Sequence, residues 1–166
     1  MINSSLSVAN FFVEKSLETG VELTPMKVIK MVYIAHGWYL ANTNEPLINE
    51  GVQAWKFGPV IETVYQQFSS FRDSQITRMA QTTVRNADNS FSELTPTLSD
   101  DRLRTFLSSV WDAYSKYSGW QLSALTHEKG TPWDETWNKH GQHNARGALI
   151  PNDVIKAHYL LKMKNN

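Results

Sequence analysis

Three histidines and two acidic residues in the last third of the chain are of the types that bind metals. His127, His140 and His143 lie close in sequence. Asp134 and Glu135 stand between them. A metal held by such residues would support hydrolase or nuclease chemistry. Their spacing matches no known ligand pattern, such as two histidines four residues apart on one helix. We therefore expect loop histidines and no bound metal, and keep a metal-dependent hydrolase or nuclease as an alternative.

No other enzyme motif accompanies this group. The chain has no GxSxG elbow, Walker loop, GxGxxG or HExxH pattern. It contains no cysteine, which excludes disulfides, thiolate nucleophiles and cysteine-based metal sites. His36 falls on the core-facing side of a predicted helix, where we expect a hydrogen-bonded buried histidine rather than a catalytic base. The sequence thus predicts a protein that is not an enzyme and has no cofactor.

Aromatic residues are the unusual part of the composition. Six Trp, six Tyr and seven Phe make up 11% of the chain. One group is Ala-Trp-Lys-Phe-Gly-Pro-Val at 54–60, and a second lies in the segment 122–133, which ends in Thr-Pro-Trp. Large aromatic side chains fill the cores of small domains, and they also dominate the hot spots of protein–protein interfaces. Both interpretations stay open for these residues.

Two helices are expected before these aromatic groups. A stripe of apolar residues from Val8 predicts an amphipathic helix that ends at Gly20. Thr24-Pro25 is an N-cap followed by proline at the first helical position, which starts a second helix. Apolar residues occupy most of the circumference of that helix, so it should be central. Only Lys27 and Lys30 are expected to point to water.

The middle of the chain predicts a small sheet. Residues 47–57 have the pattern of a hairpin that turns at 49–51. Gly58-Pro59 is expected to end the strand and to place its proline in the first turn of the next helix. The Thr-rich segment 76–84, followed by a turn at 86–89, indicates one or two edge strands.

The C-terminal half is expected to be helical again. Four helix starts are marked by caps or prolines: Ser99-Asp100-Asp101, Ser118 to Gln121, Thr131-Pro132 and Pro151. The predicted fold class is α+β and predominantly α-helical, with about six or seven helices packed around a small antiparallel sheet or hairpin. Because no linker, repeat or low-complexity tract interrupts the chain, we expect residues 1–166 to form one domain.

Charge and hydropathy exclude further classes of protein. Sixteen Lys and Arg balance sixteen Asp and Glu, so the net charge is zero. A protein that binds nucleic acid by neutralising phosphates would carry a basic excess, and we expect no direct nucleic acid binding. The N-terminus lacks a signal-peptide pattern, and the apolar region 28–40 is too short and too interrupted to span a membrane. A cytoplasmic protein is the resulting expectation.

The two aromatic groups resemble the Panacea domain, also called the SocA-like antitoxin domain, of bacterial and phage-encoded proteins. The resemblance rests on Ala-Trp-Lys-Phe-Gly-Pro-Val at 54–60, on Leu-x-x-Leu-Thr-His at 122–127 and on Pro-Trp at 132–133, in this order. It extends over nearly the whole chain, from about Leu6 to Lys162. It implies a mostly helical fold with a small sheet and the role of an antitoxin, in a family common on prophages and other mobile elements.

The same resemblance implies a partner, which is a toxin protein encoded by an adjacent gene and bound directly. The residues expected to bind it are those of the motifs: Trp55, Lys56, Phe57, Gly58, Pro59, Thr126, His127 and Trp133. They lie at junctions between elements, where loops present side chains. Two alternatives stay open. These residues could only join the sheet to the helices, and the protein could be an adaptor that delivers a toxin to a protease.

Overall fold

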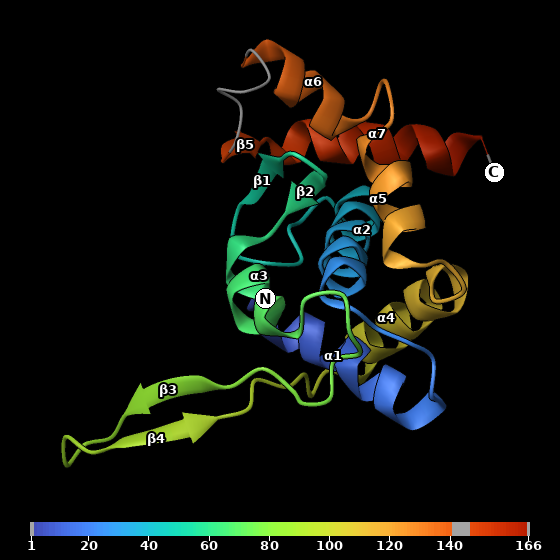
Figure 1. Cartoon of the computed structure of the whole chain (residues 1–166). Coiled ribbons are helices and arrows are strands. Elements are labelled where there is room, and N and C mark those ends of the chain that lie inside the picture. Colours follow the sequence, from blue (N-terminus) through green and yellow to red (C-terminus); the bar gives the residue numbers. More distant parts are fainter. Residues whose placement is uncertain (1, 141–146, 166) are drawn as a thin grey trace.

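Helix α2 (Pro25–Thr43) lies at the centre of the fold (Figure 1). The computed structural model describes residues 2–140 and 147–165. As predicted, Thr24 caps the helix, because its Oγ1 accepts a hydrogen bond from the Lys27 N–H at 3.3 Å. The helices that pack most extensively against α2 are α1 (Ser5–Thr19), α4 (Asp101–Tyr114), α5 (Gly119–His127) and α7 (Asn152–Lys164). This placement explains why apolar residues cover most of its circumference.

A three-stranded antiparallel sheet flanks the central helix. Strand β1 (Val52–Trp55) pairs on one side with β2 (Gly58–Val60) and on the other with β5 (Ala148–Ile150). The predicted hairpin over 47–57 with a turn at 49–51 is wrong: residues 47–48 do not pair with β1, which instead forms a hairpin with the later strand β2 around a turn at 56–57.

Pro59 was also predicted wrongly as the start of a helix. It lies in β2, and α3 (Glu62–Phe68) begins three residues later, followed by the short 3-10 helix η1 (Ser69–Phe71). Proline is tolerated there because β2 is an edge strand, where a missing N–H costs no hydrogen bond within the sheet. Gly58 has φ +114°, a conformation that side chains disfavour and that brings the chain around the turn.

Strands β3 (Thr82–Arg85) and β4 (Phe91–Leu94) form a separate ribbon that projects from the helical body (Figure 1). The prediction of one or two edge strands with a turn after them is confirmed. The side-chain amide of buried Asn10 donates to the carbonyls of Ala80 and Pro96, and its oxygen accepts from the Ala80 N–H at 2.7 Å. One side chain of α1 therefore holds both ends of the ribbon.

The C-terminal half contains α4, α5, α6 (Pro132–Lys139) and α7. Asp100 caps α4, Ser118 and Gln121 form a capping box on α5, and Thr131 caps α6. Across the described residues the fold has seven α-helices and two small antiparallel sheets, so the α+β, predominantly helical prediction is confirmed.

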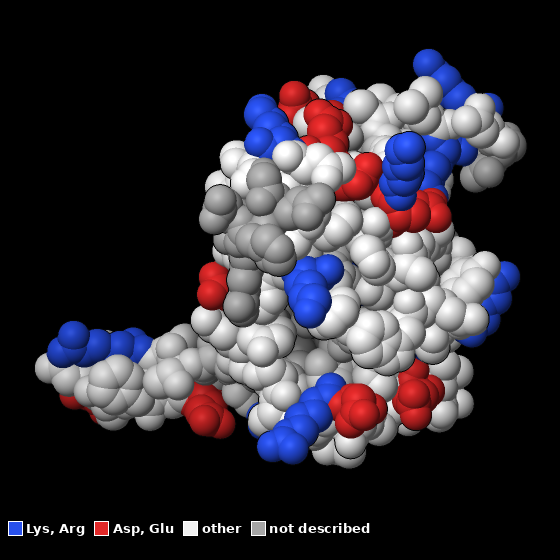
Figure 2. All heavy atoms as spheres, turned by 45° about the horizontal axis from the view of Figure 1, so that its top comes forward, with Lys and Arg blue, Asp and Glu red and all other residues white. Residues whose placement is uncertain are grey.

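Two properties of the surface bear on possible partners. Within residues 2–140 and 147–165, no helix combines the length and the apolar character needed to cross a bilayer. The face shown in Figure 2 carries Lys and Arg close to Asp and Glu, separated by wide uncharged areas. That face offers no broad region of a single charge sign with which to attract a polyanion.

Candidate functional site

The two aromatic motifs, far apart in sequence, meet where the β1–β2 turn packs on α5 and α6. Ser123 on α5 donates its hydroxyl proton to the Phe57 carbonyl at 2.6 Å. Trp133 on α6 donates its indole N–H to the Trp55 carbonyl at 2.7 Å. Both bonds run from a side chain of the second motif to the backbone of the first. The helices therefore fix the path of the turn.

Five of the eight predicted binding residues face the interior. Gly58 and Pro59 are buried in β2, and Thr126 and Trp133 are only 4% and 7% exposed. His127 is half-buried, with its ring edge-on to that of Trp133 at 5.2 Å between centroids. These positions therefore hold the turn in place.

The other three predicted residues reach the surface. Trp55 is half-buried, and its ring meets that of Tyr65 edge-on at 4.9 Å between centroids. Lys56 and Phe57 form the exposed tip of the turn, where the Lys56 Nζ lies 5.4 Å from the Phe57 ring centroid. The Phe57 ring also packs edge-on against Trp120 at 5.6 Å between centroids. We call Phe57 and Trp120 the aromatic edge; their side chains are 47% and 63% exposed.

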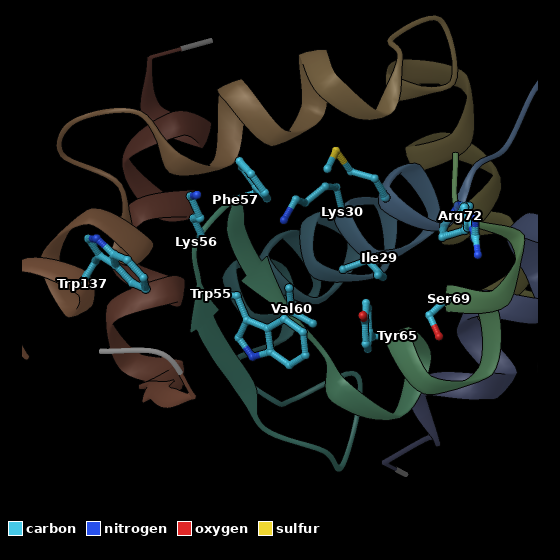
Figure 3. A pocket seen from close by; sticks show the side chains of 12 residues that line it. Ile29, Lys30, Trp55, Lys56, Phe57, Val60, Tyr65, Ser69, Arg72 and Trp137 are labelled. Carbon is cyan, nitrogen blue, oxygen red and sulfur yellow. The ribbon is translucent and has the colours of Figure 1, made fainter. Parts of the chain in front are cut away.

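Beside the aromatic edge lies a pocket of about 840 Å³ (Figure 3). Its walls combine aliphatic, aromatic and cationic side chains from α2, the β1–β2 hairpin, α3 and α6. The lining residues are Pro25, Met26, Ile29, Lys30, Trp55, Lys56, Phe57, Val60, Tyr65, Ser69, Arg72 and Trp137. Among the described residues that line it there are three cations and no carboxylate. Its volume lies in the upper part of the range typical of ligand pockets.

Lys30 was expected to point to water, and that prediction is wrong. Its side chain is 2% exposed, and its Nζ donates to the Pro59 carbonyl at 2.9 Å. A Cβ at Gly58 would lie only 2.9 Å from this ammonium, so glycine leaves the space that Lys30 fills. Burial lowers the pKa of Lys30 to about 7, because leaving water disfavours the charged form.

Lys27, one helical turn before Lys30, was also expected to point to water and is buried as well. Its Nζ donates to two backbone carbonyls, those of Glu22 at 2.9 Å and Ser115 at 2.6 Å. It does not line the pocket. Burial lowers the pKa of Lys27, and the nearby Glu22 carboxylate partly opposes that shift. The two lysines differ in that Lys30 faces the pocket.

Four cationic or aromatic members of the pocket were not predicted from the sequence. Tyr65 was placed on the apolar face of a helix, and Trp137 was noted only for its spacing from Trp133. Arg72 carried no signal, because it sits in a loop beyond η1. Lys30 carried the clearest signal. In an almost wholly apolar helix, the ammonium group of a lysine must either reach solvent or hydrogen-bond to a buried acceptor.

The histidines take other roles. Within the described residues, no three His, Asp or Glu side chains approach closely enough to hold a metal ion, and His143 lies outside those residues. His140 is exposed at the end of α6. His36 is the expected buried histidine. Its Nδ1 accepts from the Leu47 N–H at 3.3 Å, and its Nε2 is hydrogen-bonded to the Asn152 side-chain oxygen at 2.9 Å. Burial lowers the pKa of His36, so its ring is neutral.

Comparisons with known proteins agree on one family. The family model described as "Antitoxin SocA-like, Panacea domain" matches residues 28–134, a span that begins in α2 and ends in the first turn of α6. The curated protein "Antitoxin SocA" of Caulobacter vibrioides (strain NA1000 / CB15N) is 29% identical over 150 residues, which cover 90% of this chain and 79% of the relative. No solved structure matches the chain.

Proposed function

Because the chain belongs to the SocA-like antitoxin family with a Panacea domain, we propose that it neutralises a cognate toxin protein by binding it directly. The proposed partner is encoded by an adjacent gene, and the two proteins meet in the cytoplasm. Family membership supports the antitoxin role. The mode of neutralisation is inferred from the surface around the β1–β2 turn. Binding of this kind requires no catalytic group, and we assign none.

The observation that carries the proposal is the aromatic edge and the pocket beside it. Phe57 and Trp120 project large apolar rings into solvent, whereas other aromatic residues of the chain, such as Phe12, Phe68 and Trp111, are buried in the core. Exposed aromatic side chains next to a concave apolar surface are typical of interface hot spots. Lys56 stands beside Phe57 and adds a cation at the rim. Lys56 and Phe57 belong to the motif at 54–60 that the sequence resemblance singled out, and Trp120 lies two residues before the motif at 122–127.

Co-expression with the neighbouring gene tests the proposal. The neighbour's product should arrest growth alone, and the present chain should restore growth and copurify with that product. Phe57→Ala and Trp120→Ala should each weaken the complex by roughly 30-fold, the loss expected of a hot spot. Phe91→Ala is the matched control, because Phe91 is 69% exposed on the distant β3–β4 ribbon.

Two results would contradict the proposal. One is a neighbour whose toxicity the wild-type chain does not relieve. The other is relief without a physical complex between the two proteins. Circular dichroism of each variant shows whether the fold survives. The half-life of the toxin, measured with and without this chain, separates blocking from delivery to a protease, because delivery shortens it.

A further inference from the structure

A buried cation without an acidic partner lies at the inner end of the pocket. Within the described residues, the Lys30 ammonium has one hydrogen-bond acceptor, the Pro59 carbonyl, although it carries three N–H donors. No salt bridge to Lys30 is present among the described residues; the salt bridge that they contain joins Arg104 to Glu14, which do not line the pocket. Buried charges are normally paired, since a lone charge out of water is costly. The site is therefore electrostatically complementary to an anion.

The cations of the pocket are separated from one another. In Figure 3, Lys56 and Arg72 lie toward opposite ends of the pocket and Lys30 lies between them. Trp55 and Tyr65 stand together on one wall, with their rings in edge-on contact. A bound group that fits this lining must accordingly offer negative charge together with apolar surface. A single terminal carboxylate or a small inorganic anion supplies only one of these.

We propose that the pocket receives an internal acidic segment of the toxin, in which an Asp or Glu carboxylate accepts a hydrogen bond from Lys30 and a neighbouring aromatic or large aliphatic side chain packs on Trp55 and Tyr65. This inference rests on the proposed function and specifies the chemistry of the partner. The chain's zero net charge and the apolar walls of the pocket favour a peptide over a nucleic acid, whose binding depends mainly on phosphate contacts.

The proposal has a consequence for pH. The carboxylate binds the protonated form of Lys30, whose pKa in the unoccupied pocket is about 7. Affinity should therefore fall above pH 7, by at most tenfold per pH unit. Other titratable groups face the same space: Lys56, Tyr65 and Arg72 line the pocket, and His127 approaches Gly58 close to Lys30. All of them are kept in a Lys30→Met variant, so comparison with that variant isolates Lys30.

The first experiment uses random heptapeptides displayed on phage and selected on the full chain. Enriched peptides should carry Asp or Glu next to Trp, Phe or Leu. Synthetic versions should bind Lys30→Met about 10- to 100-fold more weakly than the wild type. Lys27→Met is the matched control, because Lys27 is also a buried lysine of the same helix but does not line the pocket, and it should bind like the wild type.

Several outcomes would overturn the inference. They are enrichment without acidic residues, absence of enrichment, equal binding to Lys30→Met, or an affinity that does not fall between pH 7 and 9. A mixed-sequence 20-nucleotide single strand that binds the wild type and is lost with Lys30→Met would reassign the pocket to nucleic acid.

The second experiment uses the toxin itself. If the toxin binds the wild type and Lys30→Met equally, at pH 7 and at pH 9, the inference fails and the proposed function stands. If the neighbouring product does not bind the wild-type chain at all, the proposed function fails, and the peptide selection still decides the chemistry of the pocket.

Discussion

Replacing Lys30 with methionine should stabilise the fold at neutral pH. The Lys30 side chain is almost fully buried, and its pKa is lowered from 10.5 to about 7. The unfolded chain at pH 7 is fully protonated at this position, whereas the folded chain must bury the charge or release the proton. That difference costs the native state about 4 kcal/mol at pH 7. Methionine has a similar length and no charge, so it removes the cost.

The substitution also has a cost of its own. The Pro59 carbonyl loses the donor that reaches it at 2.9 Å, which destabilises the fold by about 1–3 kcal/mol. The net stabilisation expected for Lys30→Met at pH 7 is therefore about 1–3 kcal/mol. For a domain whose whole stability is of order 5–15 kcal/mol, such a gain is readily measured.

The pH dependence of this stability difference tests the pKa of Lys30 more directly than its value at pH 7. Because the folded pKa of Lys30 is lowered, the unfolded chain binds more protons between about pH 7 and 10.5. The wild-type free energy of unfolding therefore rises with pH through this window, because the cost of burying Lys30 disappears as the unfolded chain loses its proton too. It falls again as the pH is lowered. Lys30→Met lacks this dependence on pH. The difference in free energy of unfolding between Lys30→Met and the wild type should shrink by about 3 kcal/mol between pH 7 and pH 10.

Urea unfolding of both proteins at pH 7, 8, 9 and 10 measures this difference, with the exposed lysine variant Lys129→Met as a control for loss of a charge. A constant gap between wild type and Lys30→Met at all four values would refute the reasoning. It would mean that Lys30 keeps its charge in a solvated site. The pocket would then contain no desolvated ammonium group with which to bind a carboxylate.

Two further predictions concern the central helix. A Cβ at Gly37 would collide with the Tyr159 ring of α7, so Gly37→Ala should lower the free energy of unfolding by about 1–3 kcal/mol, and an unchanged urea midpoint would refute this close approach. Burial lowers the pKa of His36 below its usual 6.5, so its contribution to stability is present above pH 6.5 and is lost as the pH falls. His36→Gln should show a smaller loss of stability than the wild type between pH 7.5 and 5, and equal losses would contradict a neutral buried ring.

Helix starts could be predicted because their signals are local. Thr24-Pro25, Ser118 with Gln121, and Thr131-Pro132 each contain the capping group and the first helical residues within four positions. Strand β5 (Ala148–Ile150) was missed because a three-residue strand has little pattern of its own and exists through pairing with β1, almost one hundred residues earlier. The misplaced hairpin turn has a similar cause, since 49–51 has turn-forming residues but no strand before it to pair with β1.

The candidate site was predicted in part for comparable reasons. The motif at 54–60 was found because its aromatic residues are unusual in sequence, and four of its members line the pocket. Lys30 was assigned to solvent because a single helix gives no information on what packs against it. Its acceptor, the Pro59 carbonyl, comes from a strand twenty-nine residues later. Arg72 and Trp137 likewise join the pocket only through the tertiary fold.

The most direct test of the central claim is the dissociation constant between this chain and the product of its neighbouring gene, measured by isothermal titration calorimetry on purified proteins. The account predicts a stable complex that Phe57→Ala and Trp120→Ala each weaken by roughly 30-fold, with Phe91→Ala equal to the wild type. A neighbouring product that is toxic and is neutralised by this chain without measurable binding, or a complex unaffected by either aromatic-edge variant, would contradict it.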